Sequence, residues 1–168
     1  MQIEAEILRI TSLRFSEAFA RIEHAIEQLD DVQVRHRPSA TSNSVGVIVQ
    51  HLIGNLNQWI CSAIGGETFQ RNRPKEFEDT NHATRDTILL ELSVLARKVD
   101  GVINHISLDS LLSSRRIQGF DETVLSAVIA AMAHLELHSG QITYLAKLIL
   151  DKKYAAYWQP GNKEQGGE

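Results

Sequence analysis

Four long stretches of this chain carry apolar residues at helical spacing, and this pattern limits the fold more than any other feature. The first stretch is the clearest, because residues 2–29 contain neither proline nor glycine, the residues least compatible with a helix interior. Its apolar residues recur at alternating steps of four and three, the spacing of one helical face: Phe15, Phe19, Ile22, Ile26 and Leu29. The pattern predicts a long amphipathic helix at the start of the chain.

Three further helices are predicted by the same periodicity and by residues that favour helix ends. The second begins after a cap at Ser42 or Ser44 and ends at Gly65–Gly66, since glycine readily takes the left-handed conformation that closes a helix. The third covers residues 84–104, and the fourth covers residues 123–150. No segment shows a sustained strand pattern, so we expect an all-α fold, a four-helix bundle.

The length of the chain, 168 residues, fits one domain with one hydrophobic core. We expect this domain to comprise residues 1–158 and to be followed by a flexible polar tail, residues 159–168. The connection between the second and third helices, residues 66–83, is longer than most helix-to-helix loops. Loops of this length are often functional, so this connection is a candidate part of a site.

The composition argues against several classes of partner. A formal charge of -4 provides no basic surface for neutralising phosphates, so we expect no nucleic-acid partner. No stretch reaches the length of a membrane span, and the first residues lack the pattern of a signal peptide, so we expect no membrane partner. The single cysteine, Cys61, excludes an internal disulfide and favours a reducing, cytoplasmic setting. We expect Cys61 to be a packed, inert side chain.

Two histidines stand four positions apart in the fourth predicted helix, in the run HLELHSGQI. His134 and His138 share a helical stripe that is mostly apolar, so both rings are expected to face the core. The other residues of this stripe are Ala127, Ala131, Gln141, Leu145 and Leu148. Side chains at this spacing lie about 5 to 6 Å apart at Cβ, close enough for two rings to bind one ion. Satisfied core histidines are the alternative, although a buried polar group without a partner costs about 1 to 3 kcal/mol.

A third histidine, His51, lies near the middle of the second predicted helix. It begins a polar line that continues through Asn55 and Gln58, next to an apolar face, as at the border of a pocket. If the second and fourth helices are neighbours, His51 completes a set of three nitrogen ligands, the number at which catalytic metal sites keep a position open. Asn55 and Gln141 lie one turn from a histidine, where they either orient ligands or form ordinary interhelical hydrogen bonds.

These segments resemble the DinB/YfiT-like superfamily over most of the chain. The similar stretches are SVGVIVQHLIGN, GGETFQRNRPKEFED and AHLELHSGQITYLAKLI. Members are four-helix bundles that bind a divalent metal through three histidines, and the resemblance maps these ligands onto His51, His134 and His138. It also implies a long crossover connection between helices 2 and 3, which places helix 2 beside helix 4. Gln70 and Ser139 depart from the usual motif, which leaves the chemistry of the pocket open.

The resemblance also implies a class of function. Characterised members include transferases that use low-molecular-weight thiols such as bacillithiol, and mycothiol-dependent isomerases. It therefore implies a metal-dependent enzyme, either a thiol S-transferase or hydrolase-like, in which a Zn²⁺- or Ni²⁺-class ion activates water or a thiol. A non-catalytic metal-binding or interaction bundle is the alternative, and no catalytic residue is assigned.

The partners expected from these interpretations are a small-molecule substrate, which includes a low-molecular-weight thiol, and a second copy of the chain. Arg71 and Arg73 in the long connection are candidates for holding an anionic substrate, because guanidinium groups bind carboxylates in two places. A homodimer is expected from the aromatic residues near the carboxyl end, Tyr154, Tyr157 and Trp158, for which pocket lining and bundle packing are the alternatives.

Overall fold

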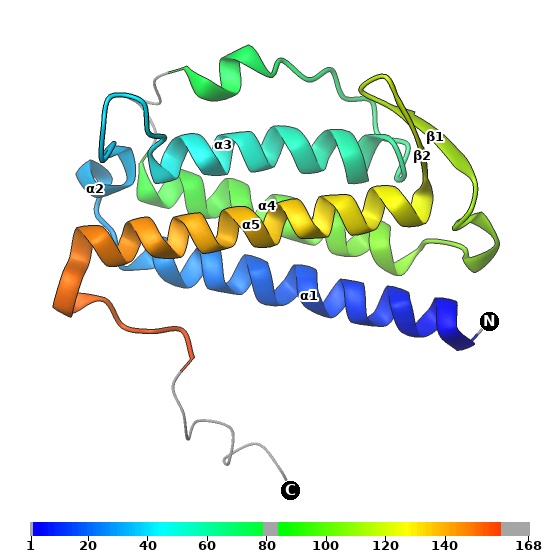
Figure 1. The fold of residues 1–168 in the computed structure, drawn as a ribbon, viewed down its shortest axis with the longest axis horizontal. Coiled ribbons are helices and arrows are strands. Elements are labelled where there is room, and N and C mark those ends of the chain that lie inside the picture. Colours follow the sequence, from blue (N-terminus) through cyan, green and yellow to red (C-terminus); the bar gives the residue numbers. More distant parts are fainter. Residues whose placement is uncertain (1, 79–83, 159–168) are drawn as a thin grey trace, which may run out of the picture.

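The structure, a computed structural model, describes residues 2–78 and 84–158. Four long helices in these residues form a bundle, with a short helix near one end and a two-stranded hairpin at the other (Figure 1). The prediction of an all-α bundle is confirmed, although the described part of the chain also contains this small hairpin. The predicted tail, residues 159–168, lies outside the described residues.

The helices begin and end close to the predicted positions. The four long ones are α1 (Gln2–Glu27), α3 (Val45–Leu56), α4 (Arg85–Asn104) and α5 (Val124–Leu150). Three of them start at a hydroxyl side chain that accepts a hydrogen bond from the backbone N–H three residues further on: Ser44, Thr84 and Thr123. Each cap satisfies a backbone donor that has no partner within its helix, which is why these residues mark helix starts.

The second predicted helix continues past α3 as a π-helical segment, η1 (Asn57–Ser62). The chain then turns at Gly65 and Gly66, where the sequence predicted the end. Gly66 has a φ of 77°, and a Cβ at Gly65 would lie 2.6 Å from the carbonyl oxygen of Cys61. Both positions therefore require glycine. The π-helical segment has no signature in the apolar periodicity, so the sequence did not predict it.

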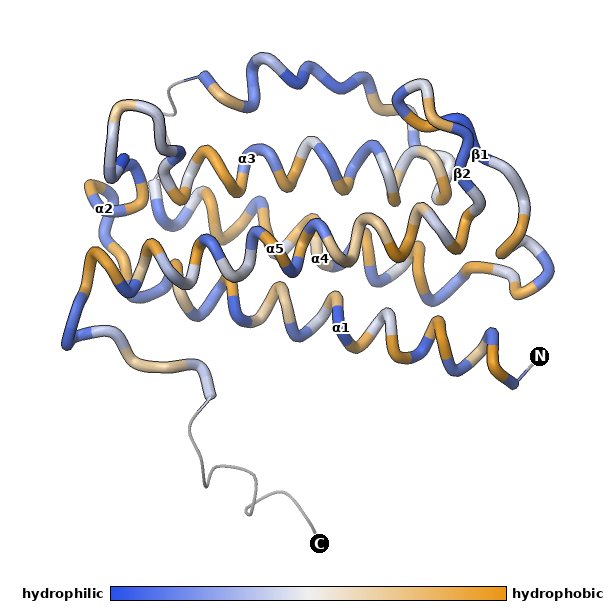
Figure 2. Tube along the Cα trace, in the orientation of Figure 1, coloured by the Kyte–Doolittle hydropathy of each residue, from blue (hydrophilic) through white to orange (hydrophobic). Residues whose placement is uncertain are grey.

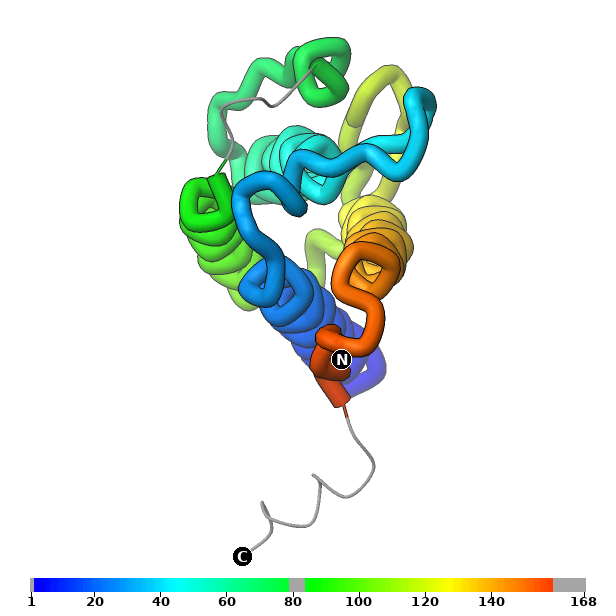
Figure 3. The backbone as a smooth tube through the Cα atoms, turned by 90° about the vertical axis from the view of Figure 1, so that its left-hand side faces the viewer, coloured from blue at the N-terminus to red at the C-terminus, as the bar shows by residue number. Residues whose placement is uncertain are grey.

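The helices are arranged in a ring in which α1 packs against α4 and α5, and α3 packs against the same two helices (Figure 3). The chain runs in the same direction along α3 and α4 (Figure 1). It must therefore return along the bundle between them, and this return passes over α3 and includes the 3-10 turn η2 (Pro74–Phe77). The predicted crossover between helices 2 and 3 is confirmed, and it lays residues 66–78 alongside α3.

The core consists of the apolar faces of these helices. The predicted stripe of α1 is buried, with Ile22 and Ile26 fully inside, and Leu92 of α4 and Leu135 of α5 meet it from the neighbouring helices. Figure 2 shows apolar and polar residues alternating along α1 and α4 at helical spacing, so each helix presents one apolar face to the interior. Cys61 belongs to this core, and burial raises the pKa of its thiol to about 11, which supports its expected inertness.

Two short elements were not predicted. The helix α2 (Asp31–Arg35) begins at Asp30, whose carboxylate accepts two backbone N–H bonds in a capping box. The strands β1 (Ser114–Ile117) and β2 (Phe120–Thr123) form an antiparallel hairpin whose turn, Gln118–Gly119, has φ values of 52° and 89°. Two positive φ values are typical of a tight hairpin turn. Segments of four or five residues are too short for periodicity to identify.

No helix in residues 2–78 and 84–158 combines the length and the apolar character needed to cross a membrane.

Candidate metal centre

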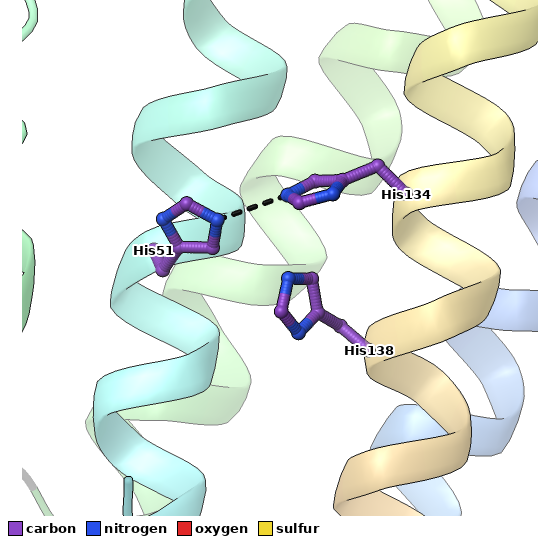
Figure 4. A group of neighbouring side chains, drawn as sticks. All are labelled: His51, His134 and His138. Atoms are coloured by element: carbon purple, nitrogen blue, oxygen red, sulfur yellow. Dashed lines mark hydrogen bonds between the residues drawn. The ribbon is translucent and has the colours of Figure 1, made fainter.

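Three histidine rings converge between α3 and α5 (Figure 4). His51 comes from α3, and His134 and His138 come from successive turns of α5. One nitrogen of each ring lies within 4.8 Å of the other two, and the Nε2 atoms of His51 and His134 are 2.9 Å apart. Since α3 and α5 pack directly against each other, the condition that the sequence left open is met.

The arrangement of the rings follows from the positions of their residues on the two helices. His51 is 7% exposed, and its ring meets those of His134 and His138 edge-on, with centroids 5.1 Å away in both cases. The rings of His134 and His138 stand one helical turn apart, with centroids separated by 4.4 Å. Both point from α5 toward α3 (Figure 4). The predicted stripe faces the interior at Ala127 and Ala131 but not along its whole length, because Gln141 and Leu148 are exposed.

A carboxylate from the crossover fixes the orientation of His51. Glu76, in η2, is 5% exposed, and its Oε2 accepts a hydrogen bond from Nδ1 of His51 over 2.9 Å. An ionised carboxylate can only accept, so Nδ1 carries the proton and Nε2 of the neutral ring presents its lone pair to the cluster. Carboxylates that hold metal-binding histidines in this way are common in protein metal sites.

Glu76 is itself held by a buried arginine. Nε and Nη2 of Arg71 donate to Oε1 and Oε2 of Glu76 over 2.5 and 2.8 Å, and both side chains are less than 10% exposed. The Nη2 atom also lies 3.4 Å from Nδ1 of His51, but two donors face each other there, so this contact is not a hydrogen bond. Burial raises the pKa of the Glu76 carboxyl, but the hydrogen bonds from Arg71 and His51 outweigh that effect and keep the pKa below its usual value.

Gly54 provides the space for this carboxylate. It lies on α3, three residues after His51, and a Cβ there would be 2.1 Å from Oε1 of Glu76. No side chain fits at that distance, so glycine allows the crossover to approach α3 closely enough for Glu76 to reach His51. The glycine weakens α3 locally, since it is among the least favourable residues in a helix interior.

The polar residues predicted around the cluster occupy different roles. Oε1 of Gln141 lies 2.7 Å from Nδ1 of His138 and accepts a hydrogen bond from it. The Oδ1 atom of Asn55 is buried and has no hydrogen-bond partner within the described residues. Gln58 accepts hydrogen bonds from Arg71, over 3.3 Å, and from Gln118 of the hairpin turn, so it links the crossover to the hairpin.

The two candidate arginines lie in different environments. Arg71 is buried and its donors bind Glu76 and Gln58, so its guanidinium is part of the protein's own hydrogen-bond network. Arg73 is exposed, and its guanidinium carbon lies 5.1 Å from the ring centroid of Phe77. The Phe77 ring in turn lies 5.1 Å from that of His51, so Arg73 is the arginine placed at the outer side of the cluster.

The environment favours neutral imidazoles. Burial lowers the pKa of all three histidines, and the neighbouring charges of His138 and His51 help to bring the pKa of His134 to about 4. Only a neutral imidazole has a lone pair for a metal ion, so at neutral pH the rings are in the form that binds metal. The cluster thus has the donor type and the protonation state of a metal site.

Sequence reasoning missed Glu76, the residue most closely associated with His51. Two signals pointed toward it: a glycine inside an apolar helix, Gly54, which often marks a close approach, and a buried histidine whose second nitrogen needs an acceptor. Neither signal identifies the partner, because six acidic residues follow within the connection and the start of α4: Glu67, Glu76, Glu78, Asp79, Asp86 and Glu91.

The aromatic residues near the carboxyl end contact the chain itself. His24 of α1 donates from Nε2 to the carbonyl oxygen of Ala155 over 2.8 Å. The ring of Tyr157 lies 5.5 Å from that of His24, while the side chain of Trp158 is 58% exposed. Tyr154 packs against the core, so contacts within the chain account for Tyr154 and Tyr157 without a second subunit.

Comparisons with known proteins agree with this fold. Residues 2–163 match a family described as "Protein of unknown function (DUF1572)". No curated protein matches the chain. Among solved structures, a conserved protein from Enterococcus faecalis superposes with a TM-score of 0.69 at 16% identity, covering 84% of this chain and 95% of that chain.

Two further structures are described as DinB-like proteins. The one from Bacillus subtilis has a TM-score of 0.68 at 16% identity and covers 89% of this chain and 98% of that chain. The one from Bacillus cereus has a TM-score of 0.63 at 14% identity and covers 79% and 85%. At these identities the likeness is one of fold. This chain belongs to the DUF1572 family of proteins of unknown function and has the DinB/YfiT-like fold that its sequence resembles.

Proposed function

We propose that His51, His134 and His138 bind a divalent metal ion of the Zn²⁺ or Ni²⁺ class and that the protein is a metal-dependent enzyme. The observation that carries this proposal is the convergence of three neutral imidazoles from two separate helices on one point. Such a cluster of buried polar rings is costly in a core unless a bonding partner compensates it.

The donor atoms fit such an ion. Tetrahedral coordination at about 2.0 to 2.1 Å places neighbouring ligand nitrogens about 3.3 Å apart. The Nε2 atoms of His51 and His134, at 2.9 Å, are close to that spacing, and no pair of donor atoms exceeds 4.8 Å. Small rotations of the rings are therefore enough to complete the site. Three protein ligands leave a coordination position open, as catalytic zinc sites do.

When bound, such an ion acts as a Lewis acid that lowers the pKa of a bound water or thiol toward neutrality. The chain's own residues prepare the site for this chemistry. Glu76 and Gln141 hold protons on the Nδ1 atoms of His51 and His138, which keeps the other nitrogens free of protons and aimed at the cluster. The unpartnered Oδ1 of Asn55 is one turn from His51 and offers an acceptor to a ligand that enters the site.

The reaction that fits best is attack by an activated thiol or water on a small-molecule substrate, as in a thiol S-transferase or a hydrolase. The thiol as a co-substrate is suggested by the superfamily resemblance. We infer that Arg73 holds an anionic group of the substrate. Its exposed guanidinium beside Phe77 supports this role, whereas the guanidinium of Arg71 is bound to Glu76. A buried free thiol at Cys61 is consistent with the reducing compartment, the cytoplasm, that we propose.

Elemental analysis of protein purified without an affinity tag tests the metal site. We expect about one equivalent of metal in the wild type and almost none in His134→Ala, because two ligands bind far more weakly than three. The exposed residue His36 provides the control, since His36→Ala should keep its metal. Equal occupancy in the two variants would contradict the assignment of the ligands.

Thiol titration of a Co²⁺-substituted sample tests the open position. A low-molecular-weight thiol that enters the coordination sphere produces a charge-transfer band, which supports the enzyme. A sample that holds Co²⁺ but shows no band with thiols, and no catalysis with thiol or ester substrates, would instead support a non-catalytic metal-binding bundle.

A further inference from the structure

A cavity of about 580 Å³ lies between the carboxyl-terminal half of α4, the turn that follows η1 and the strand β1. The end of α4 and the hairpin meet at one end of the bundle (Figure 1), so we call this space the end cavity. None of its lining residues belongs to the histidine cluster or to the hydrogen-bond network of Glu76 and Arg71. Its volume is within the range of small-molecule sites, about 300 to 1,000 Å³.

The charged residues of the end cavity are mostly cationic. Arg97 and Lys98 of α4 and Arg115 of β1 line it, and Glu67 is the one carboxylate among its described lining residues. Glu67 binds Lys98 over 2.7 Å, so these two charges cancel. The hydrogen bonds that Arg97 and Arg115 donate within the described residues go to neutral oxygens of neighbouring residues. The end cavity therefore has two uncompensated positive charges, although the whole chain has a formal charge of -4.

Unpaired arginines are uncommon in this protein. Six arginines elsewhere in the described chain form an ion pair with a carboxylate: Arg9, Arg14, Arg21, Arg71, Arg85 and Arg116. Arg97 and Arg115 instead keep their full charge and most of their donors for another partner. Since a guanidinium group binds carboxylates and phosphates through two parallel hydrogen bonds, the partner that suits these two residues is an anion.

Polar groups that complement an anion line the same cavity. Nδ1 of His105 donates to the carbonyl oxygen of Gly101 over 2.7 Å, and its Nε2 has no hydrogen bond to any residue that the structure describes. Ser107, which is exposed, adds a hydroxyl group. A phosphate group offers acceptors to guanidinium and hydroxyl donors and, in its monoanionic form, a proton to Nε2.

Gly101 keeps the middle of the end cavity open. It follows Arg97 by four residues and precedes His105 by four, so the three residues share one side of α4. A Cβ at Gly101 would meet no other atom within 4 Å, so no close contact requires glycine there. Glycine is unfavourable inside a helix, and what it provides at this position is space between two polar side chains. The half-buried side chains of Val102 and Ile106 add apolar surface beside that space.

We propose that the end cavity binds a small molecule with a phosphate group on an apolar body. Arg97, Arg115 and Ser107 bind the phosphate, and Val102 and Ile106 contact the apolar body. A phosphate suits the site better than a carboxylate, because it has up to two negative charges and three terminal oxygens for two guanidinium groups that come from separate elements. The site is independent of the metal centre, with which it shares no residue.

Titration of the full chain with phenyl phosphate, followed by NMR of the backbone amides, tests the location of the site. We expect saturable shifts at Gly101, His105 and Arg115, with a dissociation constant of about 0.1 to 1 mM. Phenol, which lacks the phosphate, should cause no such shifts. Inorganic phosphate should shift the same amides with weaker affinity, and equal affinities would show that the apolar body is not recognised.

Binding of phosphate to the metal centre has to be distinguished from binding to the end cavity. The titration is therefore made on the protein as purified and again after treatment with a chelator, and the shifts at Gly101, His105 and Arg115 should be the same in both samples. Shifts confined to the amides near His134, or no saturation up to about 10 mM, would overturn the proposal.

Arg115→Gln and Arg116→Gln form a matched pair that tests the cationic groups. Both remove one charge from β1, but Arg116 is paired with Asp121 and does not line the end cavity. We expect at least about a tenfold weaker affinity for phenyl phosphate in Arg115→Gln and in Arg97→Gln, and less than about a twofold change in Arg116→Gln. Equal changes in the two β1 variants, or an effect at Arg115 without one at Arg97, would overturn the shared site.

Gly101→Leu tests the space between the polar side chains. Leucine favours a helix more than glycine does, so Tm should not fall, while its side chain should occupy the end cavity and weaken phenyl phosphate binding at least about tenfold. An unchanged affinity would show that the ligand does not lie over Gly101, and the proposed position would be wrong.

Discussion

The link between the crossover and the metal cluster is best tested by Glu76→Gln. This substitution keeps the size and shape of the side chain but removes its charge and one of its two acceptor oxygens. The carboxylate now accepts from Arg71 at both oxygens and from His51 at one of them. An amide has only one acceptor oxygen, and its NH₂ group must face a donor on Arg71 or His51.

Glu76→Gln should lower both the stability of the protein and its affinity for the metal. The side chains of Arg71 and Glu76 are both buried, and loss of one partner from a buried ion pair costs about 3 to 5 kcal/mol. For a domain of this size that corresponds to a fall in Tm of roughly 6 to 20 °C. The second effect is on the metal, because loss of a carboxylate that orients a histidine ligand weakens metal binding about 10- to 100-fold.

Both effects can be measured on the same samples. Thermal unfolding of chelator-treated protein, followed by circular dichroism, gives the change in stability without metal. Competition titration with Zn²⁺ at a temperature well below both transitions gives the dissociation constant of the folded protein. Glu78→Gln is the matched control, because Glu78 is two residues away and exposed.

Three outcomes are distinguishable. If Glu76→Gln lowers both Tm and Zn²⁺ affinity while the control lowers neither, the crossover supports the metal centre as argued. If only Tm falls, Glu76 stabilises the crossover without orienting His51. If Glu76→Gln behaves like Glu78→Gln in both measurements, the reasoning about the buried carboxylate is refuted.

Further predictions concern packing, pH and reactivity. Gly54→Ala should lower Tm although alanine favours a helix more than glycine does, because the new Cβ would displace Glu76. Gly101→Ala has open space around its Cβ and should raise the free energy of unfolding by about 0.5 to 1 kcal/mol. Equal shifts in Tm for the two variants would contradict this difference. The metal-free protein should lose stability as pH falls from about 6.5 toward 4. In this range His134 takes up a proton in the unfolded chain but stays neutral in the folded protein, where its pKa is about 4. Midpoints of urea unfolding that do not change over this range would refute the prediction. Cys61 should not react with a thiol reagent at pH 8 until the protein unfolds, and rapid modification of folded protein would show that its burial is misjudged.

The sequence by itself determined the features that depend on neighbouring residues. Helix caps such as Ser44 and Thr123, the glycine stop after Ser62 and the apolar stripe of α1 each follow from backbone geometry within a few residues. The common orientation of His134 and His138 belongs to the same class, because residues four apart on a helix always share a face.

Only the tertiary structure decided which segments meet. Periodicity put His51 on a polar line beside the apolar face of its helix, but its 2.9 Å approach to His134 depends on the packing of α3 against α5. The roles of Glu76 and Arg71 depend on the path of the crossover, which the sequence identified only as a long connection. The physical reason is one of range: a helix repeats its own geometry every few residues, whereas the distance between separate segments is set by how the whole core packs.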